Sequence, residues 1–482
     1  MKVVIIAAFA HLGWDKEDCD QSKYAFWKCA ISREGRRMNI VDYYRNGQAG
    51  QTVRHIYNIG IVLFNYFHQH GCETHLINCL EDLSSEDIEQ VSMADVVVIS
   101  TVYAGYGDVL KNITDVVSLV RSRNSRGKIV VGGWSVYHLK KKYPDGQFQD
   151  TINRLTKAGV DVLVISRQGL NSLWRKLNEG FTGVIMDDDY ALPGPEMYSV
   201  KNLPEKYHAA HTAIVTATGC PFDCHFCEYK KLYHRVTYYS LVEVKRLLAG
   251  ISEGRRVALK HVRFGDECLN YPYGRLMEIC RFLSRANFGF SWGGFLKLGN
   301  IDEHLAREMK KSNCSFASIG MESGDVRMRK TMNKMYTDDE LEKSITVLKK
   351  YGIKTIVSLV VGYYGENEET IKVTQRVLER IMPDLARINI WQPYYLEDQS
   401  APGRKNHLSI REGFWKHDSM DLATANVWAS YLYRETKNVV FTPPFTSIFD
   451  IWPWFVGEGL DENQIVDLIG KYHRESMDAL SK

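Results

Sequence analysis

The feature that most constrains this chain is a group of three closely spaced cysteines. Cys220, Cys224 and Cys227 stand at the spacing C-x3-C-x2-C, directly after the strand-like run 212–217. Thiolates are soft ligands that suit iron–sulfur clusters and zinc. Zinc sites usually pair two such sets, and no second half follows in this sequence. Three thiolates would hold a cubane cluster and leave its last iron open to a ligand; the alternatives are zinc or unrelated thiols.

The bulk composition fits a soluble globular protein of two or three domains. The chain has 482 residues, of which 45% are hydrophobic and 25% charged. The formal net charge of +3 gives no case for binding nucleic acid or a membrane surface. No apolar run reaches the length of a membrane helix, and the apolar N-terminus is interpreted as a buried strand. Because the other cysteines are scattered, we expect no disulfide framework and a cytoplasmic location.

Residues 1–180 are predicted to form a doubly wound, Rossmann-like α/β domain. Apolar strand-like runs alternate with helical patterns, apart from a long irregular loop at 9–50. Such a pattern predicts an open parallel sheet whose ligands bind at the carboxyl ends of its strands. The expected strands are 2–8, 74–78, 95–100, 128–133 and 159–165, and the expected helices 51–70, 84–91, 109–123 and 170–177.

Small and polar residues follow two of these strands. Ser100, Thr101 and Gly105 come at the end of the third strand, and Gly132 and Gly133 end the fourth. Small residues there allow a flat ligand or a nucleotide tail to approach the backbone. No G-x-G-x-x-G opens the first helix, which argues against NAD or FAD.

Residues 181–207 are predicted to be a linker, because their acidic and proline-broken centre, 187–195, cannot continue a helix or strand. Strands and helices alternate again over 208–395 as a partial (β/α)6 barrel. Residues 396–482 are expected to be a helical, aromatic-rich segment that closes the substrate pocket. The expected barrel strands are 213–217, 261–264, 290–292, 316–320, 355–361 and 387–391; helices are expected at 241–251, 274–286, 303–311, 338–351, 413–433 and 462–480.

The cysteine triplet, with the aromatic Phe226 before its last member, resembles that of the radical S-adenosylmethionine (SAM) enzymes. The resemblance implies a 4Fe-4S cluster on the three cysteines, which are then both metal ligands and catalytic residues. It also implies SAM contacts by Phe226, by Glu322 and Ser323 in the segment 320–325, and by Gly362 and Tyr363 in the segment 361–366. The run 332–334 followed by Thr337 is a common family continuation.

A Rossmann-like domain in front of such a barrel resembles the cobalamin-dependent radical SAM enzymes. That family implies cobalamin without a histidine on cobalt, and the residue beneath cobalt would come from the loop 9–50. This chain departs from the family after the fifth strand, where Arg167-Gln-Gly-Leu170 replaces a Gly-Glu-Gly-Glu-like turn. Some relatives keep the sheet without using cobalamin. The residues implied in cobalamin binding are Ser100, Thr101, Gly105, Gly132, Gly133 and Gly169.

The resemblance implies an enzyme that cleaves SAM and abstracts hydrogen from an unactivated carbon of a small, natural-product-type molecule, followed by cobalamin-mediated C-methylation. An electron donor such as flavodoxin or ferredoxin is expected as partner. The alternatives are a cobalamin-independent dehydratase, epimerase, cyclase or decarboxylase, and a non-catalytic metal-cluster protein. Expected substrate contacts are Asp266, Glu267, Tyr395, Trp415 and His417.

Overall fold

The chain folds into two compact units in its computed structural model. The first unit comprises residues 1–19, 56–208 and 246–256, and the second comprises 20–55, 209–245 and 257–482. No helix in the part of the chain that the structure describes is long and apolar enough to cross a membrane. The described residues are 1–9, 26–29, 32–33, 36–37, 40–44, 58–80, 83–102, 109–142, 145–166, 170–187, 192–227, 229, 235–393, 406–411, 414–444 and 447–480.

The first unit is built on a six-stranded parallel sheet in the order β4-β1-β5-β6-β7-β8. Its central strands are nearly continuous runs of Val and Ile that are buried on both faces, as a sheet covered by helices requires. The doubly wound α/β fold is therefore confirmed. The strands are β1 (Lys2–Ile6), β4 (Glu73–Ile77), β5 (Val96–Ser100), β6 (Lys128–Gly132), β7 (Val162–Ser166) and β8 (Gly183–Asp187).

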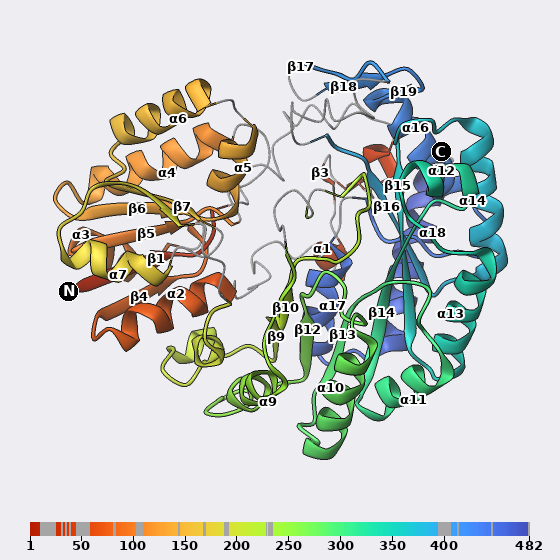
Figure 1. Ribbon diagram of the computed structural model, residues 1–482, viewed down its shortest axis with the longest axis horizontal. Coiled ribbons are helices and arrows are strands. Elements are labelled where there is room, and N and C mark those ends of the chain that lie inside the picture. The colour runs from red at the N-terminus through yellow and green to blue at the C-terminus, as the bar shows by residue number, and fades with distance from the viewer. Residues whose placement is uncertain are drawn as a thin grey trace. The chain divides into compact units, whose positions relative to one another are not determined.

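Helices cover both faces of this sheet (Figure 1). Helices α2 (Asn58–Gln69) and α7 (Leu170–Asn178) share one face, where Phe64 and Leu173 pack on the strands in a single apolar cluster. Helices α4 (Val109–Arg123) and α6 (Asp145–Ala158) lie on the other face. The unit also contains α3 (Ser85–Ser92) and α5 (Trp134–Lys142).

The sixth strand, β8, corrects the sequence prediction of five strands. It lies in the segment 181–207 that was interpreted as linker, and it pairs with β7 in parallel register. The acidic and proline signals that break regular structure begin only at Asp187, so the apolar residues before it are able to extend the sheet. Ile185, in the middle of the strand, is 1% exposed.

The second unit contains a six-stranded parallel sheet whose neighbours follow chain order, β9 to β16, as in an open β/α barrel. Its strands are β9 (His211–Ile214), β12 (His261–Phe264), β13 (Ser291–Leu296), β14 (Cys314–Glu322), β15 (Lys354–Val361) and β16 (Leu385–Ile390). The helices after β12 to β15 are α10 (Tyr273–Ala286), α11 (Glu303–Lys311), α12 (Val326–Thr331), α13 (Asp338–Lys350) and α14 (Glu368–Ile381). Helix α9 (Leu241–Gly250) spans a boundary between the two units.

The sequence predicted one helix over 413–433, and this prediction is wrong. Residues Phe414–His417 form β18, the middle strand of an antiparallel sheet with β17 (Ser409–Arg411) and β19 (Met420–Asp421). Exposed and buried residues alternate along β18, a period that suits a half-buried strand and not a helix. Helix α16 (Leu422–Glu435) starts only after Asp421, whose side chain accepts a hydrogen bond from the Thr424 amide as an N-cap.

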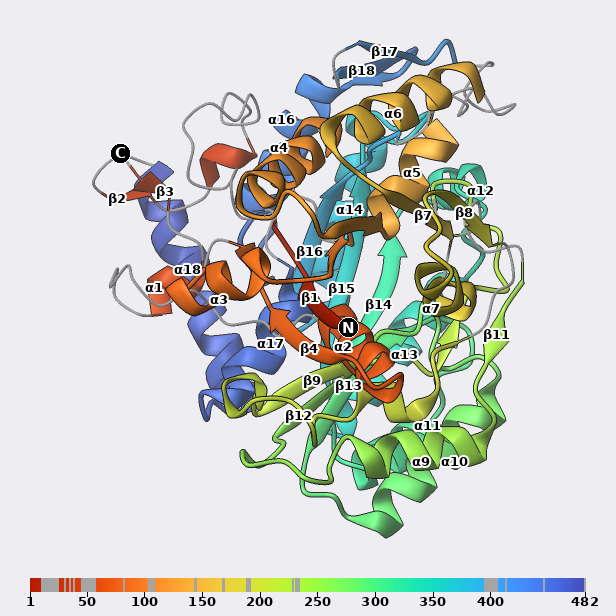
Figure 2. The same cartoon turned by 90° about the vertical axis from the view of Figure 1, so that its left-hand side faces the viewer.

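The end of the chain is helical and aromatic, as predicted. It includes α17 (Ile448–Gly457) and α18 (Glu462–Leu480). Helix α1 (Ile40–Tyr44), from the stretch predicted to be an irregular loop, packs beside α18 (Figure 2). The Tyr43 hydroxyl donates to Glu475 at 2.7 Å, and its ring lies 5.2 Å from that of Tyr472. The described remainder of this stretch forms η3 (Trp27–Cys29), β2 (Ser32–Arg33) and β3 (Arg36–Arg37).

Candidate cluster and cofactor site

The three cysteines lie on one loop, residues 219–227, which we name the cysteine loop. It leaves the short strand β10 (Ala217–Thr218), which pairs with β11 (Thr237–Tyr238). Gly219 enters the loop at φ 84°, and a Cβ there would lie 2.6 Å from the backbone oxygen of Arg235. Only glycine fits this turn without strain. All three cysteines are half-buried, whereas the side chains between them at Asp223 and His225 are exposed.

The cysteine loop is tied to the residues that follow α12. The backbone N–H of His225 donates to the Met332 oxygen at 2.9 Å. The Asn333 side-chain amide donates to the Asp223 oxygen at 2.7 Å. Asn333 takes a left-handed conformation, φ 52°, which asparagine tolerates better than most residues. The run 332–334, which the sequence analysis noted only as a family resemblance, thus supports the cysteine loop.

A buried ion pair lies beside the thiols. Lys334 Nζ is 3.0 Å from Glu322 Oε1, and both groups interact electrostatically with Cys224. Burial alone would lower the pKa of Lys334, but Glu322 and the thiols of Cys224 and Cys227 raise it above its ordinary value. Lys334 therefore stays protonated next to the cysteines, where it pairs with the Glu322 carboxylate.

Burial determines the pKa values of the thiols in the absence of a metal. It raises the pKa of Cys224 and brings that of Cys227 to about 12. A bound metal reverses this, since metal ligation deprotonates a thiol outright. A second cation, Lys297, which lies over the Phe222 ring at 4.3 Å, also interacts with Cys224. Three thiols flanked by two ammonium groups make a donor set that fits an anionic iron–sulfur cluster.

The arrangement of the thiols differs from that of a single-ion site. Among the residues with described positions, no three His, Cys, Asp or Glu side chains are placed to hold one metal ion. A cubane cluster needs no such convergence, because each thiolate binds a different iron atom. A fourth thiol, Cys268, is hydrogen-bonded to Cys220, and this contact, with burial, raises the pKa of Cys268.

Glu322 owes its position to an irregular strand end. The register of β14 with β15 shifts between Gly320 and Glu322, and Glu322 has φ 64°. Strain of this kind at a non-glycine residue persists only where the surroundings fix it. Here the Tyr336 hydroxyl donates to the backbone oxygens of Met321 and Ser323, at 2.7 and 2.9 Å.

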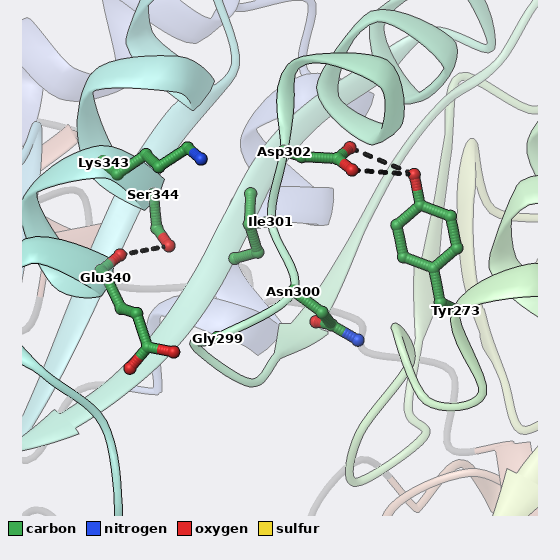
Figure 3. Close-up of a pocket in the computed structure, with 8 residues that line it drawn as sticks. All are labelled: Tyr273, Gly299, Asn300, Ile301, Asp302, Glu340, Lys343 and Ser344. Atoms are coloured by element: carbon green, nitrogen blue, oxygen red, sulfur yellow. Dashed lines mark hydrogen bonds between the residues drawn. The ribbon is translucent and has the colours of Figure 1, made fainter.

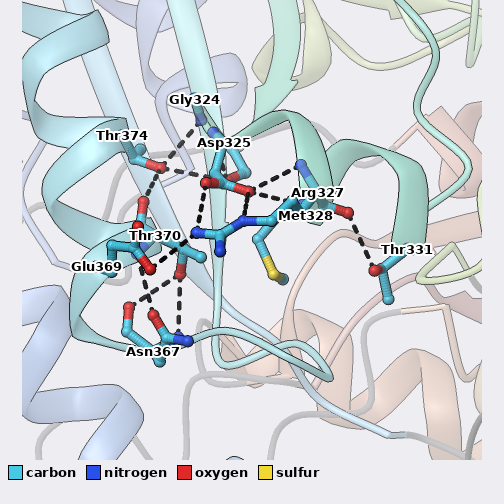
Figure 4. A network of polar contacts seen from close by, with 10 residues as sticks. Gly324, Asp325, Arg327, Met328, Thr331, Asn367, Glu369, Thr370 and Thr374 are labelled. Atoms are coloured by element: carbon cyan, nitrogen blue, oxygen red, sulfur yellow. Dashed lines mark hydrogen bonds and ion pairs between the residues drawn. The ribbon is translucent and has the colours of Figure 1, made fainter.

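A polar network around Gly324 and Asp325 fixes the rest of this turn (Figure 4). Thr374 on α14 accepts a hydrogen bond from the Gly324 amide at 3.0 Å, and its hydroxyl lies 3.2 Å from that of Ser323. Asp325 caps α12 and pairs with Arg327, which also contacts Glu369. The hydroxyl of Ser323, predicted to bind SAM, is thus fully buried and engaged with α14 and the Asp325 amide.

The residues predicted after β15 form a tight loop, 362–365, lined by aromatic rings. Gly362 has φ 97°, and its amide donates to the buried carboxyl of Glu366 at 2.5 Å. Tyr363 is 1% exposed, and its ring lies 6.4 Å from that of Phe226 in the cysteine loop. The structure therefore brings Phe226, Glu322 and Tyr363 to the same end of the second unit as the cysteines.

The predicted substrate contacts are placed differently from one another. Asp266 is 1% exposed and accepts hydrogen bonds from the Thr216 amide and hydroxyl, at 2.6 and 2.5 Å, so it links two strand ends. Burial raises the pKa of Glu267 to about 8, with a smaller contribution from electrostatic repulsion by Asp266 and Cys220. Trp415 and His417 are 2% and 3% exposed and contact the 362–365 loop. Tyr395 lies outside the described residues.

At the carboxyl edge of the first unit's sheet, where cobalamin was predicted to bind, the residues are small and hydrogen-bond to one another. Thr101 donates from its amide to the Gly132 oxygen at 2.7 Å, and Ser135 donates to the Thr101 oxygen at 2.6 Å. A Cβ on Gly133, at φ 120°, would lie 3.1 Å from the Thr101 and Val102 amides. The chain's own packing therefore accounts for glycine at position 133. Ser100 accepts a 3.4 Å hydrogen bond from the Val102 amide, whereas Gly105 and Gly169 lie outside the described residues.

Several supporting residues were missed by the sequence analysis. Lys297, Tyr336, Thr374 and Ser419 act through contacts with residues distant in sequence, and no local pattern marks them. Glu366 belongs to the segment 361–366 that was singled out. Glu366 stands between a glycine turn and an amphipathic helix, and this position could have marked its carboxyl group as buried.

A separate cavity of about 500 Å³ opens outside this site. It is lined by Tyr273, residues 299–302 and α13, and Tyr273 donates to the Asp302 carboxylate at 3.0 Å (Figure 3). Its lining includes none of the cysteines and none of the predicted SAM contacts. We assign no ligand to it.

Comparison with known proteins agrees with the cysteine loop and the barrel. Residues 214–378 match the Radical SAM superfamily. An uncharacterized methyltransferase of Pyrococcus horikoshii is 22% identical over 42% of this chain and 46% of its own length. The anaerobic magnesium-protoporphyrin IX monomethyl ester cyclase of Rubrivivax gelatinosus is 27% identical over 38% of this chain and 33% of its own. The chain thus spans less than half the length of these curated relatives.

Two solved structures share the fold of the chain at low sequence identity. The radical SAM methyltransferase TsrM of Kitasatospora setae, solved with cobalamin and a [4Fe-4S] cluster, has a TM-score of 0.55 at 15% identity, covering 70% of this chain and 73% of its own. The cobalamin-dependent radical SAM enzyme OxsB, solved with aqua-cobalamin and SAM, has a TM-score of 0.54 at 14% identity, covering 80% and 52%. Residues 214–378 are therefore a radical SAM domain, and the chain shares the fold of TsrM and OxsB, with a Rossmann-like sheet ahead of a radical SAM barrel.

Proposed function

We propose that this protein cleaves SAM at a 4Fe-4S cluster to abstract hydrogen from an unactivated carbon of a small, natural-product-type molecule, and that it C-methylates that carbon with cobalamin. The observation that carries the proposal is the placement of Cys220, Cys224 and Cys227 beside the Glu322–Lys334 pair, where the barrel strands end. When bound, the cluster supplies one electron to the SAM sulfonium, which yields the radical that removes the hydrogen atom.

Each part of the site has a separate task in this proposal. The three cysteines hold the cluster, and Lys334 and Lys297 offset its negative charge. Glu322, fixed in its left-handed conformation, accepts hydrogen bonds from the ribose hydroxyls or the amine of SAM. Gly362 and Tyr363 contact the adenine, and the aromatic rings around them exclude water from the radical.

Cobalamin is assigned to the carboxyl edge of the first unit's sheet. Ser100, Gly132 and Gly133 would hold it there, because a serine and two glycines put little side-chain bulk between a ligand and the backbone. When bound, methylcobalamin supplies the methyl group. The names of TsrM and OxsB support this assignment, since both proteins use this fold and were solved with cobalamin.

The exposed residues of the cysteine loop favour electron delivery from a partner. Pro221, Asp223 and His225 reach the surface between half-buried cysteines. A one-electron donor such as flavodoxin or ferredoxin could therefore approach the cluster closely. We place the protein in the cytoplasm, where such donors and a reducing environment are present.

A second candidate keeps the radical chemistry and omits cobalamin. It would be a dehydratase, epimerase, cyclase or decarboxylase. The hydrogen bonds that Thr101 and Ser135 make with backbone atoms favour it, because these hydroxyls already serve the chain's own packing.

The test is an anaerobic preparation from cobalamin-replete cells, analysed for iron, sulfide and corrinoid, and then incubated with reductant and SAM. About four irons per chain and release of 5′-deoxyadenosine support the radical reaction. One corrinoid per chain and transfer of an isotope-labelled SAM methyl group to carbon support the methyltransferase. A cluster and 5′-deoxyadenosine without corrinoid, even after reconstitution, would favour the second candidate. A protein that holds a cluster but leaves SAM intact would exclude both.

A further inference from the structure

We propose that His417 and Ser419, in the C-terminal antiparallel sheet, are positioning residues that hold the 362–365 loop in the conformation that binds SAM. The inference rests on the proposed function, which assigns this loop to SAM. It also gives the C-terminal sheet a task that differs from direct substrate contact.

His417 and Ser419 connect both ends of the loop through one chain of hydrogen bonds. His417 Nε2 lies 3.0 Å from the Gly362 oxygen, and Ser419 Oγ lies 3.1 Å from His417 Nδ1. The Gly365 amide donates to Ser419 Oγ at 2.9 Å. A carbonyl oxygen can only accept, so Nε2 carries the proton, and Nδ1 of the neutral ring accepts from the serine hydroxyl. Burial lowers the pKa of His417, which keeps the ring neutral.

The loop needs such external support because two of its four residues are glycines, which cost the most entropy to fix. Gly362 and Gly365 both have positive φ, 97° and 85°. In a flexible chain, glycine samples many other conformations, and each loses entropy when fixed here. His417 lies 55 residues further along the chain than Gly362, so the restraint comes from outside the barrel strands.

Aromatic packing completes the restraint. The Trp415 ring stacks on His417 at 5.2 Å with an interplanar angle of 4°, and it fills the space next to Gly362, where a Cβ would meet it at 2.7 Å. The Tyr364 ring lies 4.9 Å from that of His417. The Tyr363 ring lies 5.0 Å from that of Tyr364 and 6.4 Å from that of Phe226 in the cysteine loop. A shift of the 362–365 loop would therefore move the ring assigned to adenine.

Three variants test the inference in the anaerobic holoprotein. H417L removes both hydrogen bonds of the imidazole ring. S419A removes only the exposed serine hydroxyl, and H417Q keeps a side-chain donor that is able to reach the Gly362 oxygen. The matched control is H407N, because His407 is a histidine of the same region whose side chain is 80% exposed and pairs with Asp418. Asparagine suits the left-handed backbone of residue 407, φ 49°.

The measurements are the Kd of SAM and the KM and kcat of reductive SAM cleavage. We expect H417L and S419A to weaken SAM binding about tenfold and about fivefold, the effect of one or two hydrogen bonds. KM should rise by the same factors while kcat at saturating SAM stays near that of the wild type. H417Q should recover affinity to within about twofold, and H407N should match the wild type.

The outcomes separate this inference from the function on which it rests. Wild-type protein that binds a cluster but not SAM would overturn the proposed function and this inference with it. Wild-type protein that binds SAM, together with S419A and H417L that bind it equally well, would overturn the inference alone. If H417L does not fold, S419A decides, since it removes one hydroxyl at the surface.

Discussion

Glu322 Oε1 lies 3.0 Å from Lys334 Nζ, and the two side chains are only 9% and 11% exposed. Glu322 ends strand β14, whereas Lys334 follows helix α12, directly after the residues that hold the cysteine loop. One ion pair thus joins the predicted SAM contact to the segment that supports the cysteine loop. The pair can serve stability, SAM binding or both, and a set of three variants separates these roles.

Variant K334M should destabilise the protein by on the order of 3 kcal/mol, because it leaves the Glu322 carboxylate buried without its partner. Variant E322Q should weaken SAM binding by at least tenfold, since the amide lacks the charge that attracts the SAM ammonium group. The double variant E322Q/K334M removes both charges and should recover most of the stability. Chemical unfolding and anaerobic SAM titration of the three proteins provide the measurements.

The double variant is the decisive one. Its stability should approach that of the wild type while its SAM affinity stays low. A double variant that binds SAM as tightly as the wild type would show that Glu322 is a structural partner of Lys334 and not a SAM ligand.

The cysteine loop makes a prediction about metal content. Variants C220A, C224A and C227A should each lose most of their iron and sulfide, because a cubane held by two protein thiolates is poorly retained. The matched control is C280A on α10, where the same change from cysteine to alanine removes a fully buried thiol outside the cysteine loop. Iron, sulfide and the visible absorption of reconstituted protein are measured for all four. A C224A protein with full iron would contradict the three-cysteine site.

The regular elements were largely predictable from the sequence because their signals are local. The apolar periodicity of β12, α11 and α18 gave bounds that match the structure at both ends. The cysteine spacing identified the candidate metal ligands without any structural information. The helix over 413–433 was predicted wrongly, since Trp415 and His417 are buried by contacts with the 362–365 loop and not by a helical face.

The supporting contacts of the site could not be predicted, because they join distant residues through backbone atoms. Thr374 accepts from the Gly324 amide, 50 residues away, and Asn333 donates to the Asp223 oxygen, 110 residues away. A backbone group has the same chemistry at every position, so such a contact leaves no pattern in the residue types. The fold must bring the segments together before these partners are defined.

Two glycines of one loop test how closely Trp415 constrains the 362–365 loop. G365A should cost about 1–2 kcal/mol of stability from its positive φ alone, since its new Cβ would meet only Met328 Sδ, at 3.9 Å. G362A has the same conformational cost, and its Cβ would also lie 2.7 Å from Trp415 and 2.9 Å from Ala425. We expect G362A to be less stable than G365A by a further 1–3 kcal/mol, about the cost of overpacking.

The difference between these variants is the informative quantity. Thermal or chemical unfolding of both proteins measures it, and SAM titration shows whether the displaced loop still binds. Equal stability of G362A and G365A would mean that Trp415 moves aside easily and does not fix the loop.

Glu366 predicts a dependence of stability on pH. Its carboxyl group is 1% exposed, and burial raises its pKa to about 8, an effect that the Gly362 amide opposes and Asp325 reinforces. In the unfolded chain a glutamate ionises near its ordinary value, about 4.3. Between these two values the folded protein binds more protons than the unfolded chain, so the free energy of unfolding falls as pH rises. With about 1.4 kcal/mol per pKa unit, this group alone lowers stability by on the order of 4 kcal/mol from pH 5 to pH 8.

The variant E366Q should remove this contribution, because its amide oxygen is able to accept from the Gly362 amide and carries no ionisable proton. The matched control is E368Q, an exposed glutamate of α14 that pairs with Lys372 and should leave the pH dependence unchanged. Denaturation midpoints at pH 5, 6, 7 and 8 are compared among wild type, E366Q and E368Q. Since other groups titrate equally in all three proteins, the difference between the curves isolates Glu366. Parallel curves for wild type and E366Q would show that the carboxyl is not held protonated, and that the buried end of the 362–365 loop already carries a charge at neutral pH.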